Sequence, residues 1–192
     1  MKLCFATNNK NKLKEVSSLL SGSLLLLSLQ DIRCTEDLEE TQDTIEGNSL
    51  QKADYIFNKY KVAVFADDTG LEVDTLNGEP GVKSARYAGE ERDNEANIQL
   101  LLSNLKAKSK RDAQFKTVIT LITEKEQVQF EGVVRGRIAE AKLGDEGFGY
   151  DPIFVPDGYD VSFAQMSMAE KNEISHRGLA VKKLVDYLNQ NF

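Results

Sequence analysis

Two adjacent carboxylates, Asp67 and Asp68, are the side chains in this sequence best placed for chemistry. They follow the apolar run at residues 62–66, which is rich in β-branched and aromatic side chains and predicts a strand buried on both faces. Because Thr69 and Gly70 are common turn residues, we expect the chain to leave the sheet at the acids, where the ligand crevice of an open α/β sheet lies. The same residues would also fit a plain solvated turn.

The loop at residues 7–12 is polar and lies between an apolar run and a predicted helix that ends near residue 20. A helix that begins after a strand offers free backbone N–H groups and a partial positive charge, which suit a phosphate. Thr7 and Asn9 can add side-chain donors, and Lys12 adds a charge in the first helical turn, where a lysine is unfavourable unless an anion binds. An asparagine-rich N-cap loop without a ligand would use the same residues.

The segment at residues 144–152 holds three glycines and two aromatic residues. Glycines let the backbone approach a ligand closely, and Phe148 and Tyr150 offer flat faces on which a base could stack. The alternative is a flexible loop with a phenylalanine tucked into the core. The pattern therefore leaves a base-binding role open.

Three donor side chains, Lys171, His176 and Arg177, lie within seven residues of one another. A capping box at Ser167 and Glu170 predicts that a helix begins just before them. A lone histidine is more often structural than functional, but its cationic neighbours make this stretch a candidate for ligand binding.

The elements that must position these residues are strand-like and helical segments that mostly alternate, which predicts an α/β protein. The leucine-rich run at residues 24–29 is typical of a core strand, and the short linker at residues 124–127 predicts an antiparallel hairpin. Strands are expected at residues 3–6, 24–29, 62–66, 71–74, 115–123 and 128–138. Helices are expected after the loop at residues 7–12 to about residue 20, at residues 44–60 and 94–105, and over the C-terminal stretch.

Length and charge narrow the possible functions. The 192 residues suffice for one good-sized core, and we expect a single domain over residues 1–192. The formal charge of −7 argues against non-specific nucleic-acid binding, although Mg²⁺ can stand between carboxylates and the phosphates of a nucleotide. No apolar run approaches the roughly 20 residues that span a bilayer. Cys4 and Cys34 suggest a reducing compartment, so we expect a cytoplasmic protein without a membrane partner.

A phosphate-binding loop, an acid pair, an aromatic glycine loop and a donor cluster together suit a nucleotide bound with Mg²⁺. Catalysis would be metal-assisted attack of water on phosphorus, with a carboxylate that orients or deprotonates the water. A haloacid-dehalogenase-type phosphatase needs an aspartate two residues after Asp67, where this chain has Thr69. A nucleotide sensor without turnover could dispense with Asp68, so the intact acid set favours an enzyme.

From end to end, the chain resembles the inosine triphosphate pyrophosphatases, also called noncanonical purine NTP pyrophosphatases. Each shared motif is weak alone, but all five occur in order at family-like spacing. They are Thr7-x-Asn9-x-x-Lys12, Ala66-Asp67-Asp68-Thr69-Gly70-Leu71, Pro80-Gly81-x-x-Ser84-Ala85-Arg86-Tyr87, Gly147-Phe148-Gly149-Tyr150-Asp151-Pro152 and Glu170-Lys171-x-x-x-Ser175-His176-Arg177.

The resemblance implies hydrolysis of ITP, dITP and XTP to the monophosphate and pyrophosphate, with Mg²⁺ as cofactor. It implies that Asp68 is the catalytic acid-base and a metal-side carboxylate, and that Thr69 lies beside the substrate. Lysine, histidine and arginine donors would favour a 6-keto purine, whose acceptor replaces the amine of adenine. The remaining implied substrate-binding residues are Thr7, Asn8, Asn9 and Lys12 for the phosphates, Phe148, Gly149, Tyr150 and Asp151 for the base and sugar, and Lys171, His176 and Arg177 for the base.

One departure concerns the second helix, where relatives usually carry glutamate directly before Asn48 and this chain has Gly47. We therefore expect the second metal-side carboxylate in the acidic loop, with Glu40 as the first choice and Glu39 as the alternative. The expected architecture is a long mixed, twisted sheet flanked by helices, with two lobes and the active site in a cleft between them. The resemblance also suggests a homodimer.

Overall fold

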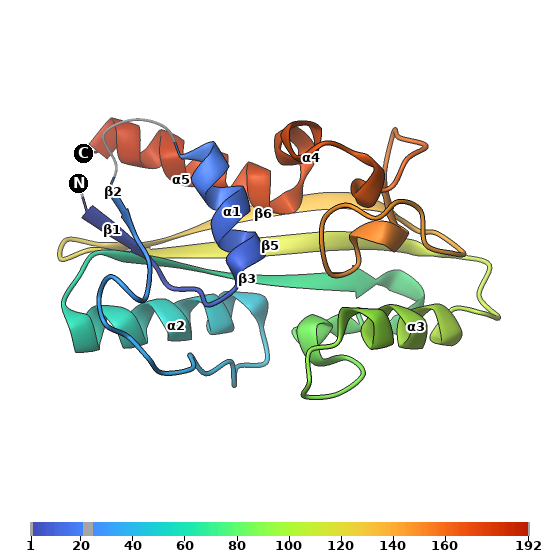
Figure 1. Ribbon diagram of the computed structural model, residues 1–192, viewed down its shortest axis with the longest axis horizontal. Coiled ribbons are helices and arrows are strands. Elements are labelled where there is room, and N and C mark those ends of the chain that lie inside the picture. The colour runs from blue at the N-terminus through green and yellow to red at the C-terminus, as the bar shows by residue number, and fades with distance from the viewer. Residues whose placement is uncertain (1, 21–24, 192) are drawn as a thin grey trace. The chain divides into compact units, whose positions relative to one another are not determined.

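The structure is a computed structural model that describes residues 2–20 and 25–191 (Figure 1). Leu24, where the expected leucine-rich strand begins, lies outside the described residues. The helices and strands are β1 (Lys2–Phe5), α1 (Lys10–Leu19), β2 (Leu25–Leu27), α2 (Ile45–Tyr60), β3 (Val64–Val73), β4 (Pro80–Gly81), α3 (Asn94–Asn104), β5 (Asp112–Ile122), β6 (Gln127–Ile138), β7 (Phe154–Pro156), α4 (Met168–Ile174) and α5 (His176–Asn191).

The strands form one mixed sheet in the order β2-β1-β3-β5-β6-β7, with β4 paired to β3. Strand β1 runs parallel to both β2 and β3, whereas β4 and β7 pair antiparallel with β3 and β6. Strands β5 and β6 are neighbours joined by a tight turn that Thr123 N–H closes onto the oxygen of Glu126, which confirms the expected hairpin. The expected mixed α/β fold is confirmed.

The chain divides into two compact units built from separate stretches of sequence. Unit 1 comprises Met1–Asp68, Thr117–Gly132 and Arg177–Phe192, and unit 2 comprises Thr69–Lys116 and Val133–His176.

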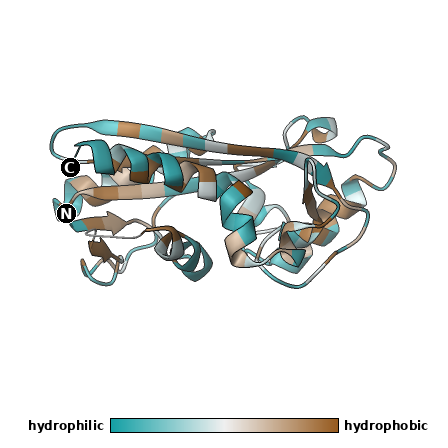
Figure 2. Ribbon diagram, turned by 90° about the horizontal axis from the view of Figure 1, so that it is seen from above, coloured by the Kyte–Doolittle hydropathy of each residue, from teal (hydrophilic) through white to brown (hydrophobic). Residues whose placement is uncertain are grey.

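Unit 1 has an apolar cluster on each face of its strands. Phe5 and Phe65 stack with ring centroids 4.5 Å apart in the cluster beneath α1 and α5, whereas Cys4 and Val64 pack with Ala53 of α2 in the other. Successive strand residues point to opposite faces, which separates the two clusters. Figure 2 shows helices banded in brown and teal, as expected of elements that are apolar on one side only.

Unit 2 has one apolar cluster, to which β3, β5, β7 and helix α3 contribute. Phe115 meets Phe154 edge to face at 4.8 Å between ring centroids, and Phe163 packs beside both. Leu101 of α3 is fully buried in the same cluster, as its spacing in the sequence predicts.

Strand β3 does not end at the acids, so the expected exit from the sheet at Asp67 and Asp68 is wrong. The strand continues to Val73, and its last part pairs with β4, where Leu71 lies opposite Gly81. Turn propensity is a local preference, and pairing and burial of the following residues override it here. The acids therefore lie inside a long strand.

The leucine-rich segment is also less buried than expected. Strand β2 covers only Leu25–Leu27, and Leu25 is 53% exposed. The reason is topological, because β2 is an edge strand that pairs with β1 alone. Within the described residues, no helix is both long enough and apolar enough to cross a membrane.

Candidate functional site

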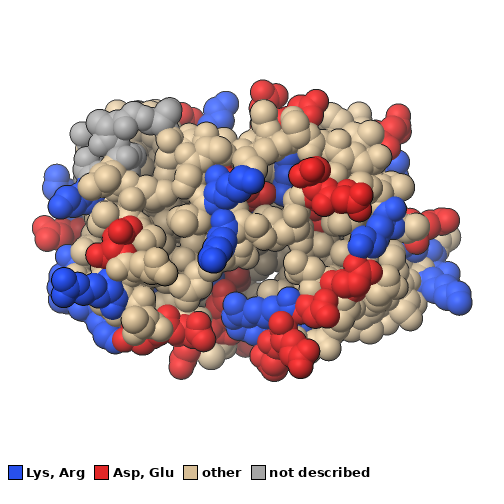
Figure 3. Space-filling view, viewed as in Figure 1, with Lys and Arg blue, Asp and Glu red and all other residues tan. Residues whose placement is uncertain are grey.

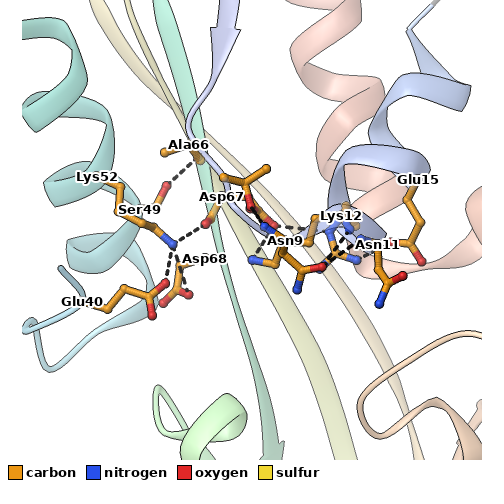
Figure 4. Close-up of polar contacts among 12 residues, drawn as sticks. Asn9, Asn11, Lys12, Glu15, Glu40, Ser49, Lys52, Ala66, Asp67 and Asp68 are labelled. Atoms are coloured by element: carbon orange, nitrogen blue, oxygen red, sulfur yellow. Dashed lines mark hydrogen bonds and ion pairs between the residues drawn. The ribbon is translucent and has the colours of Figure 1, made fainter. Parts of the chain in front are cut away.

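The two acids of β3 project into different surroundings. Adjacent strand residues point to opposite faces of a sheet, so Asp67 and Asp68 cannot act as a pair on one side. Asp67 faces Lys12 of α1, whereas Asp68 faces Lys52 of α2 (Figure 4). Asp67 also faces Arg177 of α5. We call these residues, together with Glu15 and Glu40, the charged cluster.

Asp67 is a buried anchor for two cations. Its Oδ2 lies 3.0 Å from Lys12 Nζ and 3.3 Å from Arg177 Nε, and the residue is 1% exposed. The same guanidinium also donates to the buried carboxylate of Glu15. Burial alone would raise the pKa of Asp67, but the charges of Lys12, Arg177 and Lys52 lower it to about 2. Asp67 therefore stays ionised.

Asp68 lies beside Lys52 and Glu40. The ammonium of Lys52 donates to Glu40 Oε1 at 2.6 Å and to the main-chain oxygen of Asp67 at 2.7 Å, and it lies 3.8 Å from Asp68 Oδ1. Burial raises the pKa of Asp68, and Lys52 only partly offsets that effect. The two neighbouring acids thus have pKa values shifted in opposite directions.

Two buried carboxylate oxygens, Asp67 Oδ1 and Asp68 Oδ2, accept no hydrogen bond from the described part of the chain. Buried polar atoms normally have partners, so such atoms call for a missing group. Asp68 Oδ2 is suited to receive a water, a proton or a metal ion.

The loop before α1 caps the N-terminus of that helix, and the residues predicted to bind phosphate contact one another within it. Asn9 Oδ1 accepts from the backbone N–H groups of Asn11 and Lys12, and Thr7 Oγ1 accepts from that of Asn9. Asn8 is exposed. These contacts use the acceptor oxygens of Thr7 and Asn9 and not their donor groups.

The acidic loop is fixed on α2. Thr41 and Gln51 exchange two hydrogen bonds, of 3.0 and 2.9 Å, and Gln42 N–H donates to Asn48 Oδ1 at 2.9 Å. A Cβ at Gly47 would lie 2.8 Å from Gln42 Cβ, so the glycine allows the loop to lie this close. This contact gives a physical reason for the departure at Gly47, and the loop brings Glu40 to Lys52.

The charged cluster lacks a complete set of protein ligands for a metal. Within the described residues, no three His, Cys, Asp or Glu side chains gather in a metal-binding arrangement. Mg²⁺ usually binds one or two carboxylates and takes its other ligands from water and substrate phosphates. Glu40 and Asp68, whose buried Oδ2 accepts no hydrogen bond from the described residues, fit that mode of binding.

Unit 2 brings together three of the residues predicted to bind the base. Asp151 Oδ2 lies 2.6 Å from Lys171 Nζ and accepts from the backbone N–H of Phe148 at 2.9 Å. The same ammonium lies 5.1 Å from the centre of the Phe148 ring. A Cβ at Gly147 would lie 2.2 Å from Asp151 Oδ2, so this position requires glycine. The loop is therefore built around Asp151.

Other predicted residues of unit 2 have structural contacts. Tyr150 is buried in the apolar cluster and donates to the main-chain oxygen of Ser84 at 2.9 Å, so its ring does not offer the flat surface that we expected. His176 is buried against Phe115, with ring centroids 4.6 Å apart. Gly149 and Thr69 are half-buried.

The three predicted donors belong to different units. Lys171 and His176 lie in unit 2, whereas Arg177 lies in unit 1 with Glu15 and Asp67. A base-reading role for Arg177 stays a prediction, but its contacts in the structure are those of a buried ion pair.

Two members of the charged cluster, Glu15 and Lys52, did not stand out in the sequence as functional residues. Lys52 looks like a surface lysine, because charged residues are common on helices. Its one signal is helical spacing, since Ser49 and Lys52 lie one turn apart on the side that faces β3. On the face seen in Figure 3, acidic and basic side chains are interspersed.

The fold and the charged cluster define an α/β protein whose buried acids and lysines suit phosphate chemistry. Over residues 3–187 the chain matches the Ham1 family, and it belongs to that family.

Similar proteins cover nearly the whole chain. The dITP/XTP pyrophosphatase of Flavobacterium johnsoniae is 56% identical over 98% of both chains. That of Christiangramia forsetii is 55% identical and covers 99% of this chain and 100% of its own. The structure of the Staphylococcus aureus Ham1 protein matches with a TM-score of 0.92 at 39% identity, over 100% of both chains.

Proposed function

We propose that this protein is a nucleoside triphosphate pyrophosphatase that hydrolyses the noncanonical purine nucleotides ITP, dITP and XTP to the monophosphate and pyrophosphate. The observation that carries the proposal is the buried carboxyl group of Asp68, whose Oδ2 has no partner in the described chain and whose neighbours are Lys52 and Glu40. The names of the two relatives support the substrate class.

In the proposed reaction, Asp68 orients and deprotonates the attacking water. Burial raises the pKa of Asp68, which makes it a better base than an exposed aspartate. Lys52 and Lys12 hold phosphate oxygens, and their ammonium groups offset the negative charge that develops on these oxygens and on the departing pyrophosphate. Asp67 keeps Lys12 in position and takes no part in the proton transfer.

Mg²⁺ would be held by Glu40 and Asp68 and would supply neutralisation of phosphate charge and a more acidic bound water. Charge balance supports the need for it. The charged cluster holds three basic and four acidic side chains, so it cannot neutralise a triphosphate alone.

The purine base is assigned to unit 2. Phe148 offers a ring for stacking, and Lys171 and His176 are the donors proposed for a 6-keto oxygen. Lys171 contacts Asp151, which fixes its ammonium beside the Phe148 ring.

The compartment is proposed on Cys4 and Cys34, which suggest a reducing environment, and the assembly is proposed on the resemblance. The protein is expected in the cytoplasm, as a homodimer. Light scattering on a size-exclusion column would give twice the mass of the chain, and a single-chain mass would rule the dimer out.

Turnover of dITP, XTP, ATP and GTP with Mg²⁺, with pyrophosphate and orthophosphate detected separately, tests the activity. We expect pyrophosphate from dITP and XTP and little product from ATP or GTP. Orthophosphate alone would make the protein a phosphatase and would overturn the mechanism.

A further inference from the structure

A chain of buried hydroxyl groups connects helix α2 to the strand that carries the acids. Ser49 of α2 and Thr120 of β5 are both fully buried, and their oxygens lie 2.8 Å apart. Ser49 Oγ donates to the main-chain oxygen of Ala66 at 2.9 Å. On the other side, Gln129 Nε2 donates to Thr120 Oγ1 at 2.9 Å and to the main-chain oxygen of Glu46 at 3.1 Å. All of these residues lie in unit 1.

The direction of this chain follows from the number of protons. A hydroxyl group has one proton to donate, and Ser49 gives its proton to Ala66. Thr120 must therefore donate to Ser49, and the amide of Gln129 donates to Thr120. All three donors point toward one carbonyl group, and hydrogen bonds in such a series polarise and strengthen one another.

The carbonyl group at the end of the chain belongs to the residue before Asp67. One helical turn after Ser49, Lys52 donates to the main-chain oxygen of Asp67 itself (Figure 4). Helix α2 thus holds two consecutive carbonyl groups of β3, directly before the backbone from which the Asp68 side chain projects.

Packing alone does not require these hydroxyl groups. Apolar groups of the same shape can replace a buried hydrogen-bonded pair at little cost in stability, whereas the pair fixes geometry more narrowly. Catalytic side chains need such precision, since a displacement of about 1 Å can cost on the order of 100-fold in rate.

We propose that Ser49 and Thr120 are positioning residues that hold Asp68 in its reactive orientation through the carbonyl group of Ala66. The inference rests on the proposed function for the role of Asp68, but the hydroxyl chain itself is a property of the fold.

Paired variants separate the hydroxyl group from the shape of the side chain. Thr120→Val keeps the shape and removes the hydroxyl, whereas Thr120→Ser keeps the hydroxyl. We expect Thr120→Val and Ser49→Ala to lower kcat for dITP about 10-fold, with KM changed less than about twofold, because the variants misplace an acid without removing a ligand contact. The kcat and KM of Thr120→Ser for dITP should stay close to those of the unchanged protein.

Thr123→Val is the control for lost stability. Thr123 lies just beyond the same strand, and its hydroxyl accepts from the N–H groups of Lys125 and Glu126 in the hairpin turn. This variant should lower Tm and leave kcat unchanged. Equal kcat values for Thr120→Val and Thr120→Ser, or an equal fall in Thr123→Val, would overturn the proposal.

A second readout does not depend on activity. Amide hydrogen exchange at residues 67–69 should be about fivefold faster in Thr120→Val and Ser49→Ala, which is the effect of one net hydrogen bond on an opening equilibrium. Exchange there should be unchanged in Thr120→Ser and Thr123→Val. If dITP and XTP yield no pyrophosphate with the unchanged protein, the proposed function fails, and exchange alone then decides whether the chain holds this backbone. Unchanged exchange at residues 67–69 in all four variants would refute the proposal that the hydroxyl chain holds this backbone.

Discussion

Asp67 and Asp68 are chemically identical neighbours in different surroundings. Asp67 is surrounded by cations and has a pKa of about 2, so it serves as a permanent negative charge. Asp68 is less well compensated, and burial raises its pKa. Pairs of acids whose surroundings separate their pKa values are a common way to divide the roles of anchor and proton acceptor.

Replacing Asp68 by asparagine tests the proton-accepting role. Asp68→Asn keeps the size of the side chain but cannot take a proton, so kcat for dITP should fall by about 100-fold or more. Asp186→Asn, at an exposed position of α5, is the matched control and should keep full activity. Nucleotide binding by Asp68→Asn, followed by fluorescence, should persist. If the unchanged protein also binds dITP without turnover, the protein is a sensor.

Arg177 is expected to matter for stability. Its guanidinium is the cation shared by the buried carboxylates of Glu15 and Asp67, and Arg177→Ala would leave both with less compensation. Removing one partner of a buried pair costs about 3 kcal/mol or more, so urea unfolding should show a loss of that size. Glu15→Gln combined with Arg177→Ala should cost less than the sum of the single changes. Additive losses would show that the residues do not form one network.

Sequence patterns identify residues whose chemical type is unusual for their place and miss those whose type is ordinary. Lys12 stands out because a lysine opens a helix, and Asp68 because an acid follows an apolar strand. Lys52 does not stand out, because its importance depends on Glu40 and Asp67, which meet it only in the folded chain. Tyr150 is the opposite case, since an aromatic residue in a glycine loop turned out to be a core residue.

At the scale of elements, helix α2 organises the site of unit 1. Its N-terminal half holds the acidic loop through Gln51, the carbonyl of Ala66 through Ser49 and the carboxylate of Glu40 through Lys52. Its C-terminal end is held separately, by Glu36 of the preceding loop.

The contacts of Glu36 predict a pH dependence of stability. Its carboxylate accepts from Lys59 at 2.5 Å, from Tyr60 at 2.7 Å and from the thiol of Cys34, which lowers its pKa to about 2. A lowered pKa in the folded state stabilises the fold above the ordinary value of 4.5, and the effect disappears as pH falls toward 2. The difference between the urea midpoints at pH 5 and pH 3 should therefore be smaller in Glu36→Gln than in the unchanged protein. An equal difference in both proteins would contradict the assignment.

The helices were easier to predict than the ends of the strands. Helix α2 begins after its Thr44 cap and ends at Tyr60, as capping and periodicity indicate. Strand β3 could not be bounded in this way, because the Asp-Asp-Thr-Gly sequence is typical of a turn and only pairing with β4 keeps it in the sheet. Local sequence signals report the conformational preference of a short segment, whereas the ends of a strand depend on partner strands that are distant in the sequence.

At the scale of the whole molecule, the mixed sheet and the helices on it agree with the architecture expected from the sequence. The order of strands and the division into two units were not readable from local patterns, because each unit is assembled from separate stretches of chain. The burial of Asp67 and Asp68 could not be predicted for the same reason, because the helices that cover them come from distant parts of the sequence.

Removal of the metal should affect turnover but leave the fold intact. Lys52 already provides a positive charge for both Glu40 and Asp68, so the free protein does not need Mg²⁺ to compensate these acids. With EDTA we expect pyrophosphate release from dITP to stop and Tm without nucleotide to stay within about 2 °C, less than a 1 kcal/mol effect would produce. A large drop in Tm would mean that the metal is part of the folded structure.

The placement of Asp67 and Asp68 on opposite faces also helps to fix the register of β3 in the sheet. Side chains alternate between the two faces of a strand. A shift of the β3 register by one residue would therefore turn each of the two acids to the opposite face. A slip that turned Asp67 toward Lys52 would keep an aspartate there but turn Ala66 toward Lys12 and Arg177. Those buried cations would then lack their anion, at a cost of several kcal/mol. The salt bridges of Asp67 thus disfavour this slip and keep Asp68, the acid proposed to react, on the side of Lys52.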